Sequence, residues 1–327
     1  MDVGYGMQNV RCWMQDTGCW IGEDRYGSRT QYPISSIRYP ASRIPYPASR
    51  IGSLLRNISE DTIMKQKIAG LTPGLRVLIT GAATGIGRSI AQAFLGHGAR
   101  VHIGDLSAEA LTTFGKDFPQ ASTSVVDVGD AQQVENLFDE IHTVLGGLDV
   151  LVNNAGISGP TAPLQDIEPQ DWNRTVAVDL SGAFYCMRRA VPLLLQSGGG
   201  SIVNIASNAA LFGYPLRTPY TAAKWGLIGL TKTAAMELGP HNIRVNAICP
   251  GSVDGPRIEG VIEREAQARQ VDAEVVRQSY LRQNSLRTFI QAEEVANLVL
   301  FICSDLGARI SGQALGLDGH TETLAQL

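Results

Sequence analysis

Short apolar segments alternate with longer amphipathic segments over most of the chain from residue 75 onward. The short segments cover residues 75–80, 99–104, 122–126 and 149–152, and each contains valine, isoleucine or threonine, as buried strands do. Residues 86–95 and 131–145 instead space their apolar positions three or four apart, which predicts helices. Strands that alternate with helices predict an α/β fold with a parallel sheet and right-handed crossovers.

A glycine-rich turn joins the first of these strands to the first helix. Gly81, Gly85 and Gly87 follow the strand directly, and the helix begins near Ile86. Free backbone N–H groups and the helix dipole favour an anion at such a place. The spacing Gly-x-x-x-Gly-x-Gly differs from the commonest dinucleotide motif, Gly-x-Gly-x-x-Gly, and a tight structural turn would also use glycines. The position between strand and helix favours a site for dinucleotide phosphates.

Polar side chains end the next three strands. Asp105 ends the second strand, at the distance where a carboxylate meets the adenosine ribose. It would repel a 2′-phosphate, and no lysine or arginine stands at positions 82–84 or 106 to offset this, so we expect NAD rather than NADP. Alternatively, Asp105 caps the helix that begins near Ser107. Asp127 and Asn154 follow the third and fourth strands, and ligands of parallel sheets bind at these strand ends.

The candidate catalytic residues are Ser207, Tyr220 and Lys224. Tyr220 and Lys224 are four positions apart, so on a helix their side chains share one face. A phenol is a poor base because its ordinary pKa is about 10, and one ammonium about 4 Å away supplies much of the free energy needed to favour the phenolate. Ser207, thirteen residues before the tyrosine, would hold the substrate oxygen during proton exchange. For the pair alone, an ordinary helix with a packed tyrosine and an exposed lysine is the alternative.

Together these motifs resemble the short-chain dehydrogenase/reductase family. The matching segments are residues 80–87, residues 153–156, Ser207, Tyr220 with Lys224, and Pro250 with Gly251, in the family's order and at its spacing. The resemblance covers roughly residues 74–319. It implies a Rossmann-type, three-layer α/β domain with a seven-stranded parallel sheet flanked by helices, assembled as a homotetramer or homodimer.

The resemblance also implies catalytic roles. Ser207 would polarise the substrate oxygen, Tyr220 would act as acid or base, and Lys224 would favour the phenolate and bind the nicotinamide ribose. The family usually has an asparagine where this chain has Asp179, and that asparagine helps to hold a water in the proton relay. If its backbone carbonyl holds the water, aspartate can serve; if the side chain does, proton transfer becomes slower. Asp179 is therefore a fourth catalytic candidate.

Cofactor contacts follow from the same resemblance. Asp127 would meet the adenine, Asn154 the ribose region, and the backbone of Val253 the carboxamide. A threonine that often lies four residues after the Pro-Gly motif is Gly255 here, so one cofactor contact is missing. No metal site is expected, and the expected cofactor-binding set is Gly81, Thr84, Gly85, Ile86, Gly87, Asp105, Asp127, Val128, Asn154, Tyr220, Lys224, Pro250, Gly251 and Val253.

The composition narrows the range of partners. The chain has 327 residues, 44% of them hydrophobic, and a formal net charge of −4. That charge argues against nucleic acid or an anionic membrane surface, and no apolar stretch is long enough to span a bilayer. The five cysteines are scattered without metal-ligand spacing, which favours a reducing compartment such as the cytoplasm.

Residues 1–63 do not fit this fold. They contain a tandem repeat, residues 39–44 and 46–51, and prolines recur without sustained helical or strand periodicity. We interpret them as a disordered extension or as translated upstream sequence, with the native start at Met64. A transit peptide is a third alternative, although acidic residues precede the basic part. The short-chain dehydrogenase/reductase domain is expected at residues 64–327.

Residues 256–284 are polar with helical spacing, and in the family such an insertion covers the substrate. Its apolar residues Ile258, Val261, Ile262 and Tyr280 are expected to face the pocket or the core. A lid of this kind excludes water during hydride transfer. We interpret Arg217, near the reaction centre, as a surface arginine, with an anionic substrate as the alternative explanation.

These expectations describe an NAD-dependent oxidoreductase that interconverts a secondary alcohol and its ketone, with a small-molecule substrate that the sequence does not identify. A 3-oxoacyl carrier-protein reductase is the alternative among enzymes. It prefers NADPH and a basic docking patch, and Asp105 argues against NADPH. A nucleotide-sensing protein without catalysis is the alternative of another class. Such proteins usually lose the tyrosine or the lysine, and this chain retains both Tyr220 and Lys224.

Overall fold

The computed structural model describes residues 14–15, 18–19 and 70–323, which belong to two compact units. The first unit, Met1–Asn57, contains two short antiparallel strands, β1 (Met14–Gln15) and β2 (Gly18–Cys19). The interpretations of residues 1–63 as a disordered extension, translated upstream sequence or a transit peptide concern residues that otherwise lie outside the described part of the chain. The second unit, Ile58–Leu327, contains the elements that form the predicted fold.

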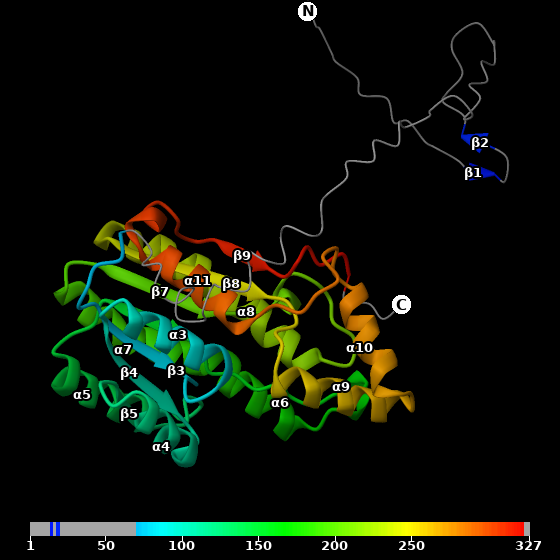
Figure 1. The fold of residues 1–327 in the computed structure, drawn as a ribbon, viewed down its shortest axis with the longest axis horizontal. Coiled ribbons are helices and arrows are strands. Elements are labelled where there is room, and N and C mark those ends of the chain that lie inside the picture. The colour runs from blue at the N-terminus through cyan, green and yellow to red at the C-terminus, as the bar shows by residue number, and fades with distance from the viewer. Residues whose placement is uncertain (1–13, 16–17, 20–69, 324–327) are drawn as a thin grey trace, which may run out of the picture. The chain divides into compact units, whose positions relative to one another are not determined.

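A parallel sheet of seven strands forms the centre of the second unit, in the order β5-β4-β3-β6-β7-β8-β9 (Figure 1). The chain builds outward from β3 through β4 to β5, then returns to add β6 on the other side of β3. This reversal creates a topological switch point between β3 and β6, where ligands of such sheets bind. The predicted sheet is confirmed, and its strands are β3 (Arg76–Thr80), β4 (Arg100–Asp105), β5 (Ser122–Val125), β6 (Val150–Asn153), β7 (Gly200–Ile205), β8 (Ile243–Pro250) and β9 (Ala314–Leu317).

Helices cover both faces of the sheet and give the predicted three layers. On one face lie α3 (Gly85–Gly96), α4 (Ala108–Asp117) and α11 (Ala292–Cys303). On the other lie α5 (Ala131–Leu145), α7 (Gly182–Gln196) and α8 (Thr218–Leu238). The short helix α6 (Pro169–Val176) precedes α7, and 3₁₀ turns lie at Leu164–Asp166, Asn208–Ala210, Gly239–His241 and Asp305–Gly307.

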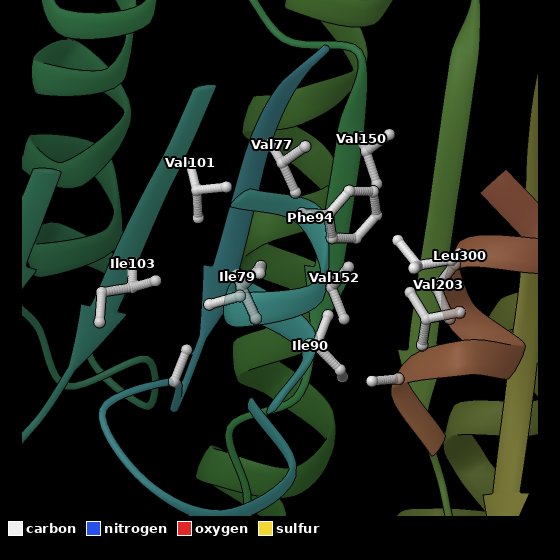
Figure 2. Close-up of a cluster of buried hydrophobic side chains, with 14 of the residues drawn as sticks. Val77, Ile79, Ile90, Phe94, Val101, Ile103, Val150, Val152, Val203 and Leu300 are labelled. Carbon is white, nitrogen blue, oxygen red and sulfur yellow. The ribbon is translucent and has the colours of Figure 1, made fainter. Parts of the chain in front are cut away.

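Alternate residues of each strand point to opposite faces and so build two separate cores. Val77 and Ile79 of β3 pack with α3 and α11, whereas Leu78 between them packs with α5 and α7. Figure 2 shows the first of these cores, in which the Phe94 ring of α3 lies close to Val77 and Val150 of the sheet. Central strands such as β6 and β8 are buried on both faces and therefore largely apolar, which explains why they form continuous apolar runs in the sequence, whereas the edge strand β5 is mostly polar.

Two further helices, α9 (Pro256–Arg269) and α10 (Ala273–Arg282), lie where the polar helical insertion was predicted. Asp272 caps α10 by accepting the Glu274 N–H at 2.7 Å. The pair has a small core of its own, apart from both sheet cores, made of Ile258, Val261, Ile262, Ala266, Val276 and Tyr280. Within residues 70–323, no helix is both long and apolar enough to cross a bilayer.

Candidate active site

A cavity of about 600 Å³ opens at the carboxyl ends of the strands, beside the switch point. All the predicted site residues line it except Gly87 and Asp179. Gly87 lies next to the lining residue Asn154, and Asp179 is hydrogen-bonded to the lining residue Ile157. The described residues contain no cluster of histidine, cysteine, aspartate and glutamate that could hold a metal ion. The lining thus includes Gly81, Thr84, Gly85, Ile86, Asp105, Asp127, Val128, Asn154, Ser207, Tyr220, Lys224, Pro250, Gly251 and Val253.

Close backbone approach shapes the glycine-rich turn after β3. A Cβ at Gly81 would lie 2.6 Å from Ala155 Cα, and one at Gly87 would lie 2.5 Å from Gly81 O, so both positions require glycine. Gly85 has a φ of +55° and lines the cavity, and a Cβ there would meet nothing within 4 Å. Thr84 makes no side-chain cap, so the first N–H groups of α3 are open to an anion. The turn therefore fits the phosphates of a dinucleotide.

Asp105 holds the same turn from the end of β4. Its Oδ2 accepts the Ala83 N–H at 3.0 Å, and its Oδ1 accepts the Ser107 N–H at 3.0 Å. Ser107 itself caps α4 by accepting the Ala110 N–H, so the alternative in which Asp105 caps this helix is wrong. An ionised carboxylate has about four acceptor positions, so Asp105 can accept further hydrogen bonds from a ligand in the cavity that it lines.

Asp127 and Asn154 have partners within the protein. Asp127 Oδ2 accepts from Arg174 Nη1 at 2.8 Å, and Arg174 also lines the cavity. Sequence analysis missed this arginine, since the two residues are 47 positions apart and no local pattern connects them. Asn154 donates from Nδ2 to the carbonyls of Thr80 at 3.0 Å and Gly81 at 2.7 Å, and so braces the glycine-rich turn. Their contacts with adenine and ribose stay predictions.

Ser207, Tyr220 and Lys224 meet at the cavity as their spacing suggested. Ser207 follows β7, and its Oγ accepts the Ala209 N–H at 3.1 Å. Tyr220 and Lys224 lie one turn apart on α8, with Lys224 Nζ 5.7 Å from the centroid of the Tyr220 ring. Lys224 Nζ also donates to Ile205 O at 3.1 Å. The alternative of an exposed lysine on an ordinary helix is wrong, because Lys224 is buried.

A family model described as enoyl-(acyl carrier protein) reductase matches residues 81–320. The chain belongs to the short-chain dehydrogenase/reductase family. It is 39% identical to trans-4-hydroxycyclohexanecarboxylate dehydrogenase of Sinomonas cyclohexanicum, over 74% of this chain and 90% of that protein. It is 37% identical to 3-oxoacyl-[acyl-carrier-protein] reductase of Thermotoga maritima, over 74% of this chain and 95% of that protein. The crystal structure of NAD⁺-bound xylitol dehydrogenase matches with a TM-score of 0.72 at 30% identity, over 75% of this chain and 98% of that chain.

The family membership confirms the predicted enzyme class. Short-chain dehydrogenase/reductases of this kind are NAD(P)-dependent oxidoreductases that act on CH–OH groups, and the chain has that activity class.

Asp179 is a departure from the short-chain dehydrogenase/reductase pattern, and the structure gives it two partners. It lies in a π-helical turn, Ala177–Ser181, between α6 and α7. Oδ1 accepts the Ile157 N–H at 2.7 Å, while Oδ2 lies 3.8 Å from Lys224 Nζ and has no hydrogen-bond partner within the described ranges. Burial raises the pKa of Asp179 above its usual range, and the Lys224 ammonium opposes that rise. Asp179 thus connects the loop after β6 to the active-site lysine.

Arg217 is not a surface residue of this short-chain dehydrogenase/reductase, so that interpretation is wrong. It is 4% exposed and lines the cavity. Its Cζ lies 5.3 Å from the centroid of the Tyr220 ring and 5.4 Å from that of the Tyr214 ring, in the range of a cation–π contact. In the sequence, only its position three residues before Tyr220 hinted at this place.

Helices α9 and α10 form one wall of the cavity. Ile258, Val261 and Tyr280 line it, as predicted for the apolar residues of this insertion. The Tyr280 hydroxyl donates to Glu265 Oε2 at 2.9 Å and is hydrogen-bonded to the Tyr214 hydroxyl. Burial raises the pKa of Tyr214 to about 12 and also raises that of Tyr280, so both hydroxyls are neutral at physiological pH.

Proposed function

We propose that this protein is an NAD-dependent dehydrogenase that interconverts a secondary alcohol and its ketone. The observation that carries the proposal is that Ser207, Tyr220 and Lys224 line one cavity with the glycine-rich turn and Asp105. Hydride transfer at a carbinol carbon needs a proton-exchange group and a dinucleotide site in one place, and the residues that line this cavity support both. Two relatives named above, as dehydrogenases of a hydroxycyclohexanecarboxylate and of xylitol, support an alcohol substrate.

The chain's own residues would carry the proton chemistry. Ser207 Oγ would hold the alcohol oxygen while the phenolate of Tyr220 takes the hydroxyl proton; in the reverse direction the phenol returns that proton to the ketone oxygen. Lys224 would favour the phenolate, because its buried ammonium lies beside the Tyr220 ring. Asp179 would hold Lys224 in place. When bound, the nicotinamide supplies the acceptor for the hydride that leaves the carbinol carbon.

Asp105 supports NAD as the preferred cofactor. Its carboxylate lines the cavity at the end of β4 and can accept hydrogen bonds from ribose hydroxyls, whereas a 2′-phosphate there would meet a like charge. Leu106, the next residue, also lines the cavity and offers no positive charge. The relative solved with NAD⁺ bound supports the same choice.

The substrate would lie beneath α9 and α10. Ile258, Val261 and Tyr280 of this pair line the cavity and give the wall on that side apolar surface, beside the charged Arg257. A cover of this kind excludes water and strengthens the electrostatic contacts inside the site.

A 3-oxoacyl carrier-protein reductase is the second candidate function, favoured by the 37% identity to a relative of that name. Such a reductase prefers NADPH, and Asp105 argues against that cofactor. A nucleotide-sensing protein without catalysis is the third candidate. The retention of Ser207, Tyr220 and Lys224 at one cavity argues against it.

Cofactor and substrate panels distinguish these three functions. Tryptophan fluorescence titrations with NAD and NADP measure the affinity for each cofactor, and NAD reduction is then followed with a panel of secondary alcohols, sugar alcohols and dihydrodiols. We expect tighter binding of NAD and turnover of at least one alcohol. Faster reduction of a 3-oxoacyl thioester with NADPH would instead support the reductase, and binding without turnover in either direction would support the sensor.

A further inference from the structure

Arg217 stands directly before α8 and presents a guanidinium that the protein barely uses. Nη2 donates to Ser158 O at 2.7 Å, but the buried Nε has no hydrogen-bond partner in the part of the chain that the structure describes. Among the described residues, Nη1 has no acceptor either. A guanidinium has five N–H donors in a planar fork, so most of this group's donating capacity is unused.

No carboxylate of the described residues forms an ion pair with this buried guanidinium, although the charge of Asp179 interacts with that of Arg217 over a longer distance. Asp179, the buried acid nearest the reaction centre, faces Lys224 at 3.8 Å. Glu265 does not line the cavity. Its carboxylate accepts hydrogen bonds from the Arg269 guanidinium at 3.1 Å and from the Tyr280 hydroxyl at 2.9 Å. Burial of an unpaired charge costs far more than its stacking on two aromatic rings returns. The position of Arg217 therefore indicates an anionic partner that enters the cavity.

The surroundings of Arg217 favour such a partner. Tyr214 and Tyr280 are neutral, and Ile258 and Val261 add apolar surface, so the low local dielectric strengthens an ion pair formed here. Arg257 also lines the cavity and donates to Gly156 O at 3.0 Å, which adds a second positive charge. Arg217, Arg257 and Lys224 thus bring three positive side chains to the cavity, although the chain as a whole is acidic.

We propose that Arg217 binds an anionic group of the substrate, which makes hydroxy acids the substrate class. The carboxylate of such a molecule pairs with the guanidinium fork while its secondary hydroxyl lies against Ser207 and Tyr220. Because the guanidinium lies beside the ring of Tyr220, one small molecule reaches both groups. The inference rests on the proposed dehydrogenase function, of which it specifies the substrate.

A purely structural role for Arg217 is the competing explanation, and the chain offers a matched control for it. Arg217 and Arg264 both hold the loop after β6, the first through Ser158 O and the second through Ser158 Oγ at 3.1 Å. Arg217 lines the cavity, whereas Arg264 is not among the described residues that line it. Arg264→Met therefore removes an arginine of α9 that holds the same loop, without changing the proposed anion site.

Matched pairs of substrates test the proposal. Steady-state rates with NAD are measured for hydroxy acids and their methyl esters, with the hydroxyl at carbon 2, 3 or 4, on wild type, Arg217→Met, Arg217→Lys and Arg264→Met. We expect wild type to prefer an acid to its ester. Arg217→Met should lower kcat/KM for that acid by about 10- to 100-fold, mainly through KM, and for the ester by less than about threefold. Arg217→Lys should retain part of the preference, and Arg264→Met all of it.

Equal losses for acid and ester in Arg217→Met would overturn the proposal and make Arg217 a structural support. Wild-type turnover of neutral alcohols in preference to acids would overturn it as well. Calorimetric titration of the wild-type NADH complex with short monocarboxylates gives a second measurement that needs no turnover, and we expect binding that Arg217→Met lacks. Carboxylate binding without oxidation of any alcohol would support the anion site and contradict the dehydrogenase function. Oxidation of neutral alcohols without carboxylate binding would overturn the anion site alone.

Discussion

Lys224 Nζ lies 3.8 Å from Asp179 Oδ2, and both side chains are almost fully buried. The same ammonium donates to Ile205 O and lies beside the ring of Tyr220. Asp179 is fixed in turn by the Ile157 N–H, which donates to its other oxygen. The aspartate that replaces the family's asparagine therefore balances the charge of the lysine on which the proposed chemistry depends.

The Lys224–Asp179 pair makes a first prediction about stability. Asp179→Leu should lower the free energy of unfolding by about 3–5 kcal/mol, because removing one partner of a buried pair leaves an uncompensated charge. Asp179→Asn also removes the charge but keeps an oxygen that accepts the Ile157 N–H, so its stability should lie between those of the wild type and Asp179→Leu. Urea denaturation of the three proteins measures the difference. If Asp179→Asn is as stable as the wild type, the charge pair does not contribute as described.

Tyr220→Phe tests the proton-exchange step. It should lower kcat at least about a hundredfold, because general acid–base catalysis contributes about 10²–10⁴-fold. The affinity for NAD should change little, since the ring and its contacts with Arg217 and Lys224 remain. Steady-state kinetics measure kcat, and a fluorescence titration measures the affinity for NAD. Near-normal turnover of this variant would remove Tyr220 from the mechanism.

His102 in β4 is buried within a chain of hydrogen bonds that determines its tautomer. Ser124 Oγ donates to Glu140 Oε2 at 2.6 Å, so it must accept from His102 Nε2, which is 2.8 Å away. Nδ1 then accepts from Ser122 Oγ at 2.8 Å. The neutral ring satisfies every partner, and burial lowers the pKa of His102 to about 4.

The depressed pKa of His102 predicts a loss of stability in acid. Above pH 6.5 the ring is neutral in both states and contributes no pH dependence. Between pH 6.5 and 4 the unfolded chain takes up a proton that the folded protein does not, so stability falls as the pH decreases. The shift from an ordinary pKa of 6.5 to about 4 corresponds to about 3 kcal/mol.

Comparison with His102→Gln isolates the contribution of this histidine. The free energy of unfolding of each protein is measured by denaturant titration at several pH values between 4 and 7.5. Below pH 7, the free energy of unfolding of the variant should depend less steeply on pH than that of the wild type. Above pH 7, the two slopes should be equal. Parallel curves for wild type and variant across this range would contradict the assignment.

The fold and the main site residues could be predicted because they depend on local pattern. Strands such as β6, buried on both faces, leave continuous apolar runs, and the parallel order brings the residues that end them to one edge. The glycine-rich turn was recognisable because Gly81 and Gly87 leave no space for a side chain. Ser207, Tyr220 and Lys224 were found through their spacing.

Other parts of the site depend on contacts that spacing does not reveal. Arg217 was taken for a surface residue, because its burial requires Tyr214 from a loop and Ser158 from the segment after β6. The pair of Arg174 and Asp127 joins residues far apart in the chain. Charged side chains are exposed by default, and only the tertiary packing shows which of them the fold has enclosed.

Cofactor choice depends on Asp105 and its neighbour Leu106. Wild type should prefer NAD to NADP by at least about tenfold in kcat/KM, a difference of about 1.4 kcal/mol, which the repulsion between Asp105 and a 2′-phosphate readily supplies. Asp105→Ala with Leu106→Arg should move the preference toward NADP, because Leu106 is exposed at the cavity and an arginine there can bind the phosphate. Asp105→Ala with Leu106→Gln is the control, since it loses the same bonds to Ala83 and Ser107 without adding a charge. Equal use of NADPH and NADH by the wild type would show that Asp105 only supports the glycine-rich turn, and would favour the reductase function.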